Sequence, residues 1–129
     1  MKKKSEEKCR EIMERLLNTK LPSSHPSWLR NPQTGKVLEL DGYNSDFITQ
    51  IGYGLAFEYD GQQHKKFNAF MHKTESNFKK QLIRDDAKNQ ICLSKGVLLV
   101  RIPHFENRTD ESMERDIKKI LKKQNLLLF

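Results

Sequence analysis

A continuous apolar segment in the C-terminal third constrains the fold more than any other feature of the sequence. Residues 97–103 read Val-Leu-Leu-Val-Arg-Ile-Pro, and an apolar run of this length is typical of a buried central strand. A predicted long helix precedes it over residues 74–94, with Thr74 as the N-cap and Gly96 just beyond its end. This succession favours a mixed α/β domain, in which helices flank a small central sheet.

Alternating apolar and polar residues predict the strands that would pair with this segment. Strict alternation predicts strands over residues 36–41 and 55–60, and a further short strand is expected over residues 47–51. The glycine-containing segments 42–45 and 52–54 are expected to be turns between them.

Apolar residues three and four positions apart predict two more helices, over residues 5–18 and from a Thr109 cap onward. The predicted order is therefore helix-strand-strand-strand-helix-strand-helix. A chain of 129 residues is close to the usual size of one domain, so a single domain over residues 1–129 is expected.

The charge balance favours a polyanionic partner. Lys and Arg number 24 against 17 Asp and Glu, which gives a net charge of +7. A positive field of this size favours nucleic acid among the polyanions. No segment approaches the roughly 18 consecutive apolar residues that a membrane span requires, so no membrane partner is expected.

The remaining composition indicates a reduced compartment. The basic N-terminus has no apolar stretch behind it, which argues against a secretory signal. Cys9 and Cys92 lie far apart in helical patterns, so an intracellular location, cytoplasmic or nucleoid/nuclear, is the simpler interpretation. No Cys-x-x-Cys pair is present and the four histidines are scattered, so a zinc site is not expected.

Acidic residues recur at alternate positions of the two predicted strands. Glu39 and Asp41 would share one face of the first strand, and Glu58 and Asp60 one face of the second, opposite Phe57. If these strands pair, four carboxylates converge and repel one another unless a cation binds. Mg²⁺ takes carboxylate oxygens and suits phosphodiester hydrolysis, because it lowers the pKa of an attacking water.

An ordinary structural interpretation stands beside this one. Half-exposed strands commonly carry polar residues on their solvent faces. Two features favour the metal site: only carboxylates occupy these successive positions, and each strand ends at a glycine, Gly42 or Gly61, where a ligand could approach the backbone.

Four segments resemble the PD-(D/E)XK, restriction-endonuclease-like superfamily, and more closely its small members related to very-short-patch-repair endonucleases and DUF559-type domains. Residues 38–44 resemble the strand with the first catalytic aspartate, and residues 58–64 resemble an E-x-D-G-x-x-H signature. Residues 84–88 fit an R-D-x-x-K helix start, and residues 96–103 fit the final core strand. The resemblance covers nearly the whole chain.

The resemblance implies a Mg²⁺-dependent endonuclease acting on DNA, with Mn²⁺ expected to substitute and no small-molecule cofactor. Asp41 and Glu58 would hold the metal, and Glu39, Asp60 and Glu6 would have supporting or second-metal roles. Glu6 is included because such domains place a helix glutamate near the metal.

One departure from the superfamily concerns its usual lysine, two residues after the second acid, where this chain has Asp60. The role of that lysine must pass to another group, and Gln62, Gln63, His64 and Lys88 are the candidates. Lys88 is attractive because a helix lysine could reach the same space, and the pKa of a histidine suits a general base.

The segment after the second strand mixes cations with aromatic rings. Lys65, Lys66 and Lys73 would contact phosphates, and Phe67 would wedge or stack, although packing under the loop is an equal alternative for that ring. Arg84 would face phosphate from the helix, where a solvated face is as plausible.

Three other functions remain open. A catalytically inactive nucleic-acid-binding module on the same fold would explain the missing lysine. A hydrolase acting on RNA or nucleotides, or a plain structural domain, would fit the same fold class. A domain of this size could act as a monomer or a homodimer.

Overall fold

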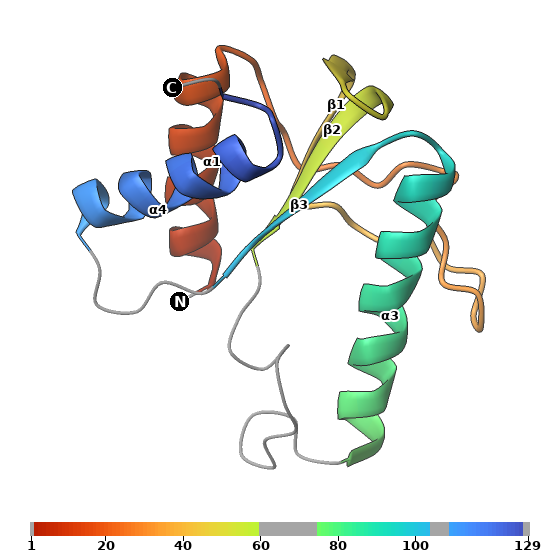
Figure 1. Cartoon of the computed structure of the whole chain (residues 1–129). Helices are drawn as coiled ribbons and strands as arrows, with labels where there is room; N and C mark the ends of the chain where they lie inside the picture. Colours follow the sequence, from red (N-terminus) through yellow and green to blue (C-terminus); the bar gives the residue numbers. More distant parts are fainter. Residues whose placement is uncertain (1, 60–74, 104–108, 128–129) are drawn as a thin grey trace.

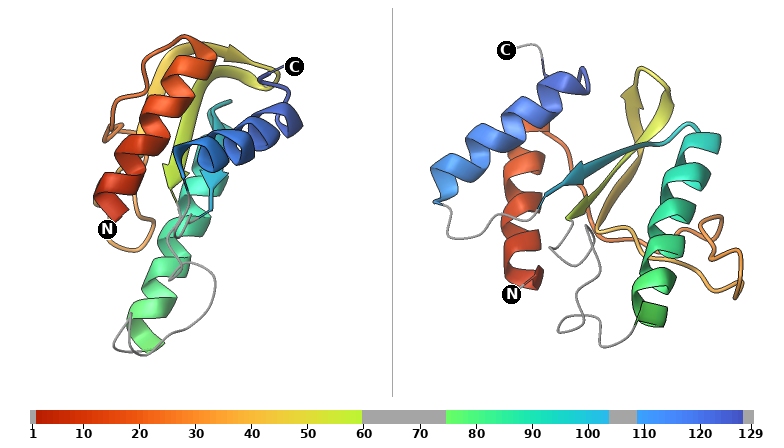
Figure 2. Two further views of the ribbon diagram at one scale, coloured as in Figure 1. Left: turned by 90° about the vertical axis from the view of Figure 1, so that its left-hand side faces the viewer. Right: turned by 60° about the horizontal axis from the view of Figure 1, so that its bottom comes forward.

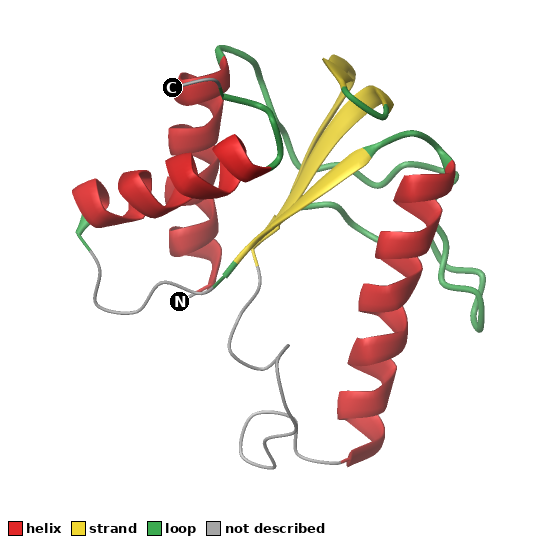
Figure 3. Cartoon of the chain, viewed as in Figure 1, coloured by secondary structure: helices red, strands yellow, loops and turns green. Residues whose placement is uncertain are grey.

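The computed structural model describes residues 2–59, 75–103 and 109–127. It is a mixed α/β fold with three helices and a three-stranded mixed sheet in this described part (Figures 1 and 3). The elements in chain order are α1 (Lys2–Leu17), β1 (Gly42–Thr49), β2 (Gly52–Tyr59), α3 (Glu75–Ser94), β3 (Leu98–Ile102) and α4 (Asp110–Lys123).

The sheet has the order β1-β2-β3, with β1 antiparallel and β3 parallel to β2. The connection from β2 to β3 contains α3, as a parallel crossover requires. Helices α1 and α4 lie on one side of the sheet and α3 on the other (Figures 1 and 2).

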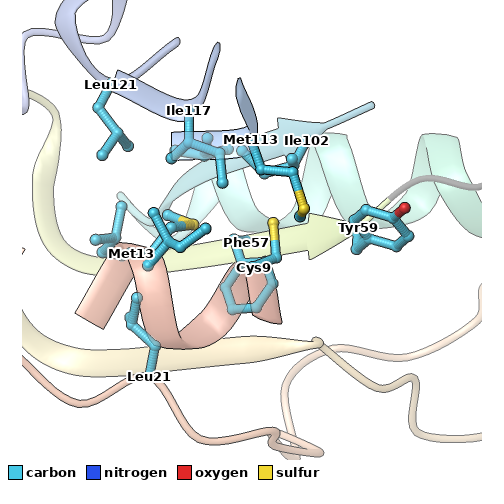
Figure 4. Close-up of a cluster of buried hydrophobic side chains, with 12 residues drawn as sticks. Cys9, Met13, Leu21, Phe57, Tyr59, Ile102, Met113, Ile117 and Leu121 are labelled. Carbon is cyan, nitrogen blue, oxygen red and sulfur yellow. The ribbon is translucent and has the colours of Figure 1, made fainter. Parts of the chain in front are cut away.

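Alternation along β2 directs its side chains to two separate cores. Phe57 and Tyr59 face α1 and α4, while Ala56 and Glu58 face α3. The core on the α1/α4 side appears in Figure 4 and contains these buried residues: Cys9, Ile12, Met13, Leu21, Leu55, Phe57, Tyr59, Val100, Ile102, Met113, Ile117 and Leu121. The smaller core beneath α3 contains Leu29, Leu38, Leu40, Ala56, Ala87, Cys92 and Val97.

The predicted helices are confirmed within the described residues. The Thr109 hydroxyl accepts a hydrogen bond of 3.1 Å from the Ser112 backbone N–H, which is the expected cap of α4. Gly96 has a φ of 74° just beyond α3, a left-handed conformation that favours glycine. Thr74 lies outside the described residues. None of the helices described is both long and apolar enough to cross a membrane.

The predicted strand over residues 36–41 is wrong, so one strand fewer precedes α3 than expected. This segment makes only isolated bridges, between Ser24 and Leu40 and between Arg30 and Val37. Its alternation arises because Leu38 and Leu40 are buried beneath α3, and burial alone can produce the pattern of a strand.

The predicted turns at 42–45 and 52–54 are wrong as well, because they begin β1 and β2. Of the short strand expected over residues 47–51, residues 47–49 form the end of the longer β1, and residues 50–51 lie in the turn before β2. Gly54 has a φ of 120° inside β2, and a Cβ there would lie 2.9 Å from Cγ2 of Val97. The close approach of the Val97 side chain to β2 therefore requires a glycine at position 54.

Strand β3 was expected at the centre of the sheet and lies at the edge of the three strands that the described residues form. Its apolar run is explained by helices α3 and α4, which both contact it. Covering both faces of a strand gives the same pattern whether or not it has two neighbouring strands.

Candidate active site

Asp41 and Glu58 are the two buried charged residues in the described part of the chain, with 3% and 2% of their surfaces exposed. Each carboxylate accepts a hydrogen bond from the backbone of the segment that carries the other. Glu58 Oε2 accepts a 2.8 Å hydrogen bond from the Asp41 N–H, and Asp41 Oδ2 accepts one of 2.8 Å from the Tyr59 N–H. Carboxylates bound to backbone amides are fixed in orientation, so this part of the site is preorganised.

Lys88 reaches this pair from helix α3. Its Nζ lies 2.7 Å from Glu58 Oε1, and its side chain is 14% exposed. The contact exists because β2 directs Glu58 toward α3, on which Lys88 lies. Lys88 is the one candidate for the missing lysine that lies among the described residues, and it lies against Glu58.

The pKa of Glu58 is raised above its ordinary value, chiefly because burial penalises the charged carboxylate. The Lys88 ammonium opposes this shift, the charge of Asp41 adds to it, and the hydrogen bonds from Lys88 and the Asp41 N–H lower it. Lys88 therefore favours the ionised form of Glu58 against the effect of burial.

Arg10 approaches the same site from α1. It donates to the backbone oxygen of Asp41, to that of Leu21 at 2.9 Å, and to Glu6 Oε2 at 3.2 Å. Sequence reasoning missed Arg10. The spacing of four residues between Glu6 and Arg10 could have indicated their ion pair, but not the contact with Asp41.

Arg101 was also missed. It is the register partner of Glu58 on β3, so both side chains face α3. Its guanidinium donates to the side chain of Asn89 and to the backbone oxygen of Asp85, both at 3.0 Å. These two hydrogen bonds therefore link β3 to α3 next to Lys88.

Glu39 does not share the environment of Asp41, and the expectation that these residues lie on one strand face is wrong. The side chain of Glu39 is 51% exposed and its Oε2 lies 3.8 Å from His25 Nε2. The reason is that residues 36–41 form no strand ladder.

Arg84 lies one turn before Lys88 on α3 and donates to Gln81 at 3.2 Å.

Several expected site residues lie outside the described residues: Asp60, Gln62, Gln63, His64, Lys65, Lys66, Phe67 and Lys73.

The donor chemistry of the buried pair fits a magnesium ion. No cluster of three or more His, Cys, Asp and Glu side chains suited to a metal occurs among the described residues. Magnesium, however, usually takes one or two carboxylates and completes its shell with waters and phosphate oxygens. Asp41 and Glu58 satisfy that smaller requirement.

A surface hollow of about 420 Å³ lies away from these carboxylates. It is open and charged, which is typical of a solvated helix surface, and none of the residues that line it is buried. We place the candidate site at the buried pair for this reason. The hollow is lined by Glu11, Glu14, Arg15, Asn18, Thr19 and Lys20.

Comparison with known proteins finds neither a matching family model nor a matching solved structure. Uncharacterized protein 094L of Frog virus 3 is 30% identical over 119 residues, which cover 92% of this chain and 70% of that protein. The chain belongs to the same protein family as 094L. Uncharacterized protein 033L of Invertebrate iridescent virus 3 is 36% identical over 107 residues, or 83% of this chain.

The chain spans only part of these viral relatives. The matched region is 52% of 033L and 41% of Uncharacterized protein 307L of Invertebrate iridescent virus 6, which is 35% identical over 86 residues. All three are described as uncharacterized, so family membership brings no activity with it.

In this member of the family, we expect both cysteines to be unreactive in the native state. Burial is the main cause that raises the pKa of Cys9 to about 12 and that of Cys92 to about 11. Nearby Asp41 adds to the shift of Cys9, and Glu58 to that of Cys92. Since the thiolate is the nucleophile, a chromogenic disulfide reagent at pH 8 should react at least about a hundredfold more slowly than with a free thiol.

Unfolding in urea should expose both thiols and restore rapid reaction. Fast release of one equivalent of chromophore from the native protein would contradict the buried placement.

Proposed function

We propose that the protein is a metal-dependent endonuclease on a restriction-endonuclease-like fold, which hydrolyses DNA phosphodiester bonds. The observation that carries the proposal is the buried set of Asp41, Glu58 and Lys88, drawn from the segment before β1, from β2 and from α3. Two acids and a lysine in one preorganised group are the components that the sequence resemblance leads one to expect.

Asp41 and Glu58 would be the metal ligands. The chemistry that a bound magnesium ion supplies is a water of lowered pKa and neutralisation of charge on the scissile phosphate. Asp41 and Glu58 present their carboxylates in fixed directions, because backbone N–H groups hold one oxygen of each. Fixed ligands avoid the cost of reorganising the site at the moment of reaction.

Lys88 would take the place of the lysine that Asp60 replaces in the sequence motif. Its ammonium favours the ionised form of Glu58, which is the form that can bind a cation. It also stands at the carboxylates, where a charge on Lys88 would attract the phosphate and orient the attacking water. The net charge of +7 supports DNA as the polyanion attracted to the protein.

The test is cleavage of supercoiled plasmid with magnesium, with manganese, and with chelator. We expect nicking or linearisation that requires a metal, and a loss of at least about a hundredfold in Asp41→Asn and Glu58→Gln. These amides retain an oxygen that can accept the backbone hydrogen bonds, so the fold should persist. Glu39→Gln is the matched control, since Glu39 is half-exposed, and it should cleave normally.

A second candidate function is a DNA-binding module without cleavage. The ion pair between Lys88 and Glu58 favours it, because the ammonium neutralises that carboxylate without a metal. This alternative predicts a gel shift of plasmid that survives chelation, and no cleavage with either metal. That result, obtained with folded wild-type protein, would overturn the nuclease proposal.

A further inference from the structure

We propose that Arg10 is a positioning residue, which holds the backbone at Asp41 so that its carboxylate points into the site. The inference rests on the proposed function and deepens it. It assigns the N-terminal helix α1 a task in the active site, in addition to its packing against the sheet.

The contacts of Arg10 converge on one short stretch of backbone. Its guanidinium donates to the carbonyl oxygens of Asp41 and Leu21, and its central carbon lies 5.7 Å from the centre of the Phe57 ring. A guanidinium presents its donors in a rigid planar fork. The two carbonyls are therefore held in one fixed relation to α1.

Asp41 needs such a clamp because the strand ladder does not hold it. Residues 36–41 make only isolated bridges, and β1 begins at Gly42. The N–H of Asp41 donates to Glu58, and its carbonyl accepts from Arg10. These two contacts fix both peptide planes that flank Asp41, so that its carboxylate lies where the Tyr59 N–H donates to it.

Glu6 supports Arg10 in this scheme. Glu6 and Arg10 form an ion pair at 3.2 Å, and their side chains are only 18% and 19% exposed. A guanidinium that is largely shielded from solvent requires a counter-charge and acceptors for its hydrogens. The arrangement assigns Glu6 to the orientation of Arg10, where the sequence resemblance had placed it as a supporting metal ligand.

The test compares Arg10→Lys and Arg10→Met with the same changes at Arg15. Arg15 lies on the same helix but is 59% exposed and pairs with Glu114 on the surface. Lysine keeps the charge of Arg10 and loses the fork that spans two carbonyls. Glu6→Gln is a milder variant that weakens the same clamp, if the changes at Arg10 impair folding.

Two readouts separate positioning from general stability. The first is the pair of ¹H–¹⁵N amide signals of Asp41 and Tyr59, which donate to the two carboxylates. The second is plasmid cleavage resolved into kcat and KM. We expect both amide signals to move and kcat to fall about tenfold or more with KM unchanged, because small misplacements at a reacting centre are costly. The Arg15 variants should change neither readout.

Unchanged amide signals in folded Arg10 variants would overturn the inference, as would shifted signals with unchanged kcat. If the signals move but the wild-type protein cleaves nothing, Arg10 still positions Asp41 and the nuclease proposal alone fails.

Discussion

Replacing Lys88 with methionine is expected to lower the free energy of unfolding at neutral pH by about 3 kcal/mol or more, because a buried charge would lose its partner. Glu58 is 2% exposed and accepts from Lys88 at 2.7 Å. Methionine matches the length of the lysine side chain while removing the charge, so little packing is lost. Urea unfolding of wild type and variant measures the difference.

The effect of Lys88→Met should depend on pH in a definite direction. Burial raises the pKa of Glu58 above its ordinary value of 4.5, and Lys88 opposes that shift. The folded state therefore favours protonated Glu58. Its contribution to stability is present below pH 4.5 and is lost as the pH rises through the folded pKa. Without Lys88 the folded pKa rises further, so the loss at neutral pH is greater.

The destabilisation by Lys88→Met should consequently be small in acid and largest at neutral pH. Adding Glu58→Gln removes the unpaired charge, so the double variant should be more stable than Lys88→Met at neutral pH. Lys79→Met is the control on the same helix, because Lys79 is 70% exposed and pairs with exposed Glu75. A destabilisation of equal size at acid and neutral pH would contradict the role of the ion pair.

Substitution of Gly42 by alanine is expected to cost about 2–3 kcal/mol of unfolding free energy, because it overpacks a closed core. A Cβ at Gly42 would overlap the ring of Phe57 and lie 2.9 Å from the carbonyl oxygen of Leu21. Phe57 is fully buried and Arg10 lies over its ring, so the ring has little room to move. Thermal or urea unfolding checks the expected loss.

Gly42→Ala should also disturb the candidate site, because Gly42 follows Asp41 directly in the chain. Plasmid cleavage by Gly42→Ala should fall even at temperatures where the protein stays folded. Gly35→Asn is the matched control, because a Cβ at Gly35 meets nothing within 4 Å and asparagine tolerates its φ of 75°.

Replacing the Phe57 ring by the smaller leucine side chain, in the double variant Gly42→Ala/Phe57→Leu, should recover part of the lost stability. The effects of the two changes on the free energy of unfolding should therefore not be additive. Additive losses would mean that Phe57 is not what excludes a side chain at Gly42. Close packing against Phe57 and Leu21 explains why residue 42 is a glycine. The sequence had suggested instead that Gly42 leaves room for a ligand.

Local patterns in the sequence were sufficient to predict the helices and to predict on which face of β2 Glu58 lies. Periods of 3.6 and 2 report which side of an element is apolar, and this property holds wherever the element packs. The Thr109 cap and Gly96 beyond α3 are local signals of the same kind, and both are present in the structure.

The same patterns failed where two arrangements bury the same residues. Leu38 and Leu40 alternate with polar residues in a segment that crosses beneath α3 without a strand ladder. The apolar run of β3 is covered by helices on both faces at the edge of the sheet. Periodicity records burial, and burial does not specify which neighbour provides it.

The sequence by itself therefore determined that Asp41 and Glu58 follow apolar segments and that Glu58 faces away from Phe57. Only the tertiary structure decided which groups meet them. Glu58 lies 17 residues from Asp41 and 30 from Lys88, and Arg10 lies 31 from Asp41. Contacts over such separations follow from how α1 and α3 pack on opposite faces of the sheet, and this packing depends on the shapes of both cores together.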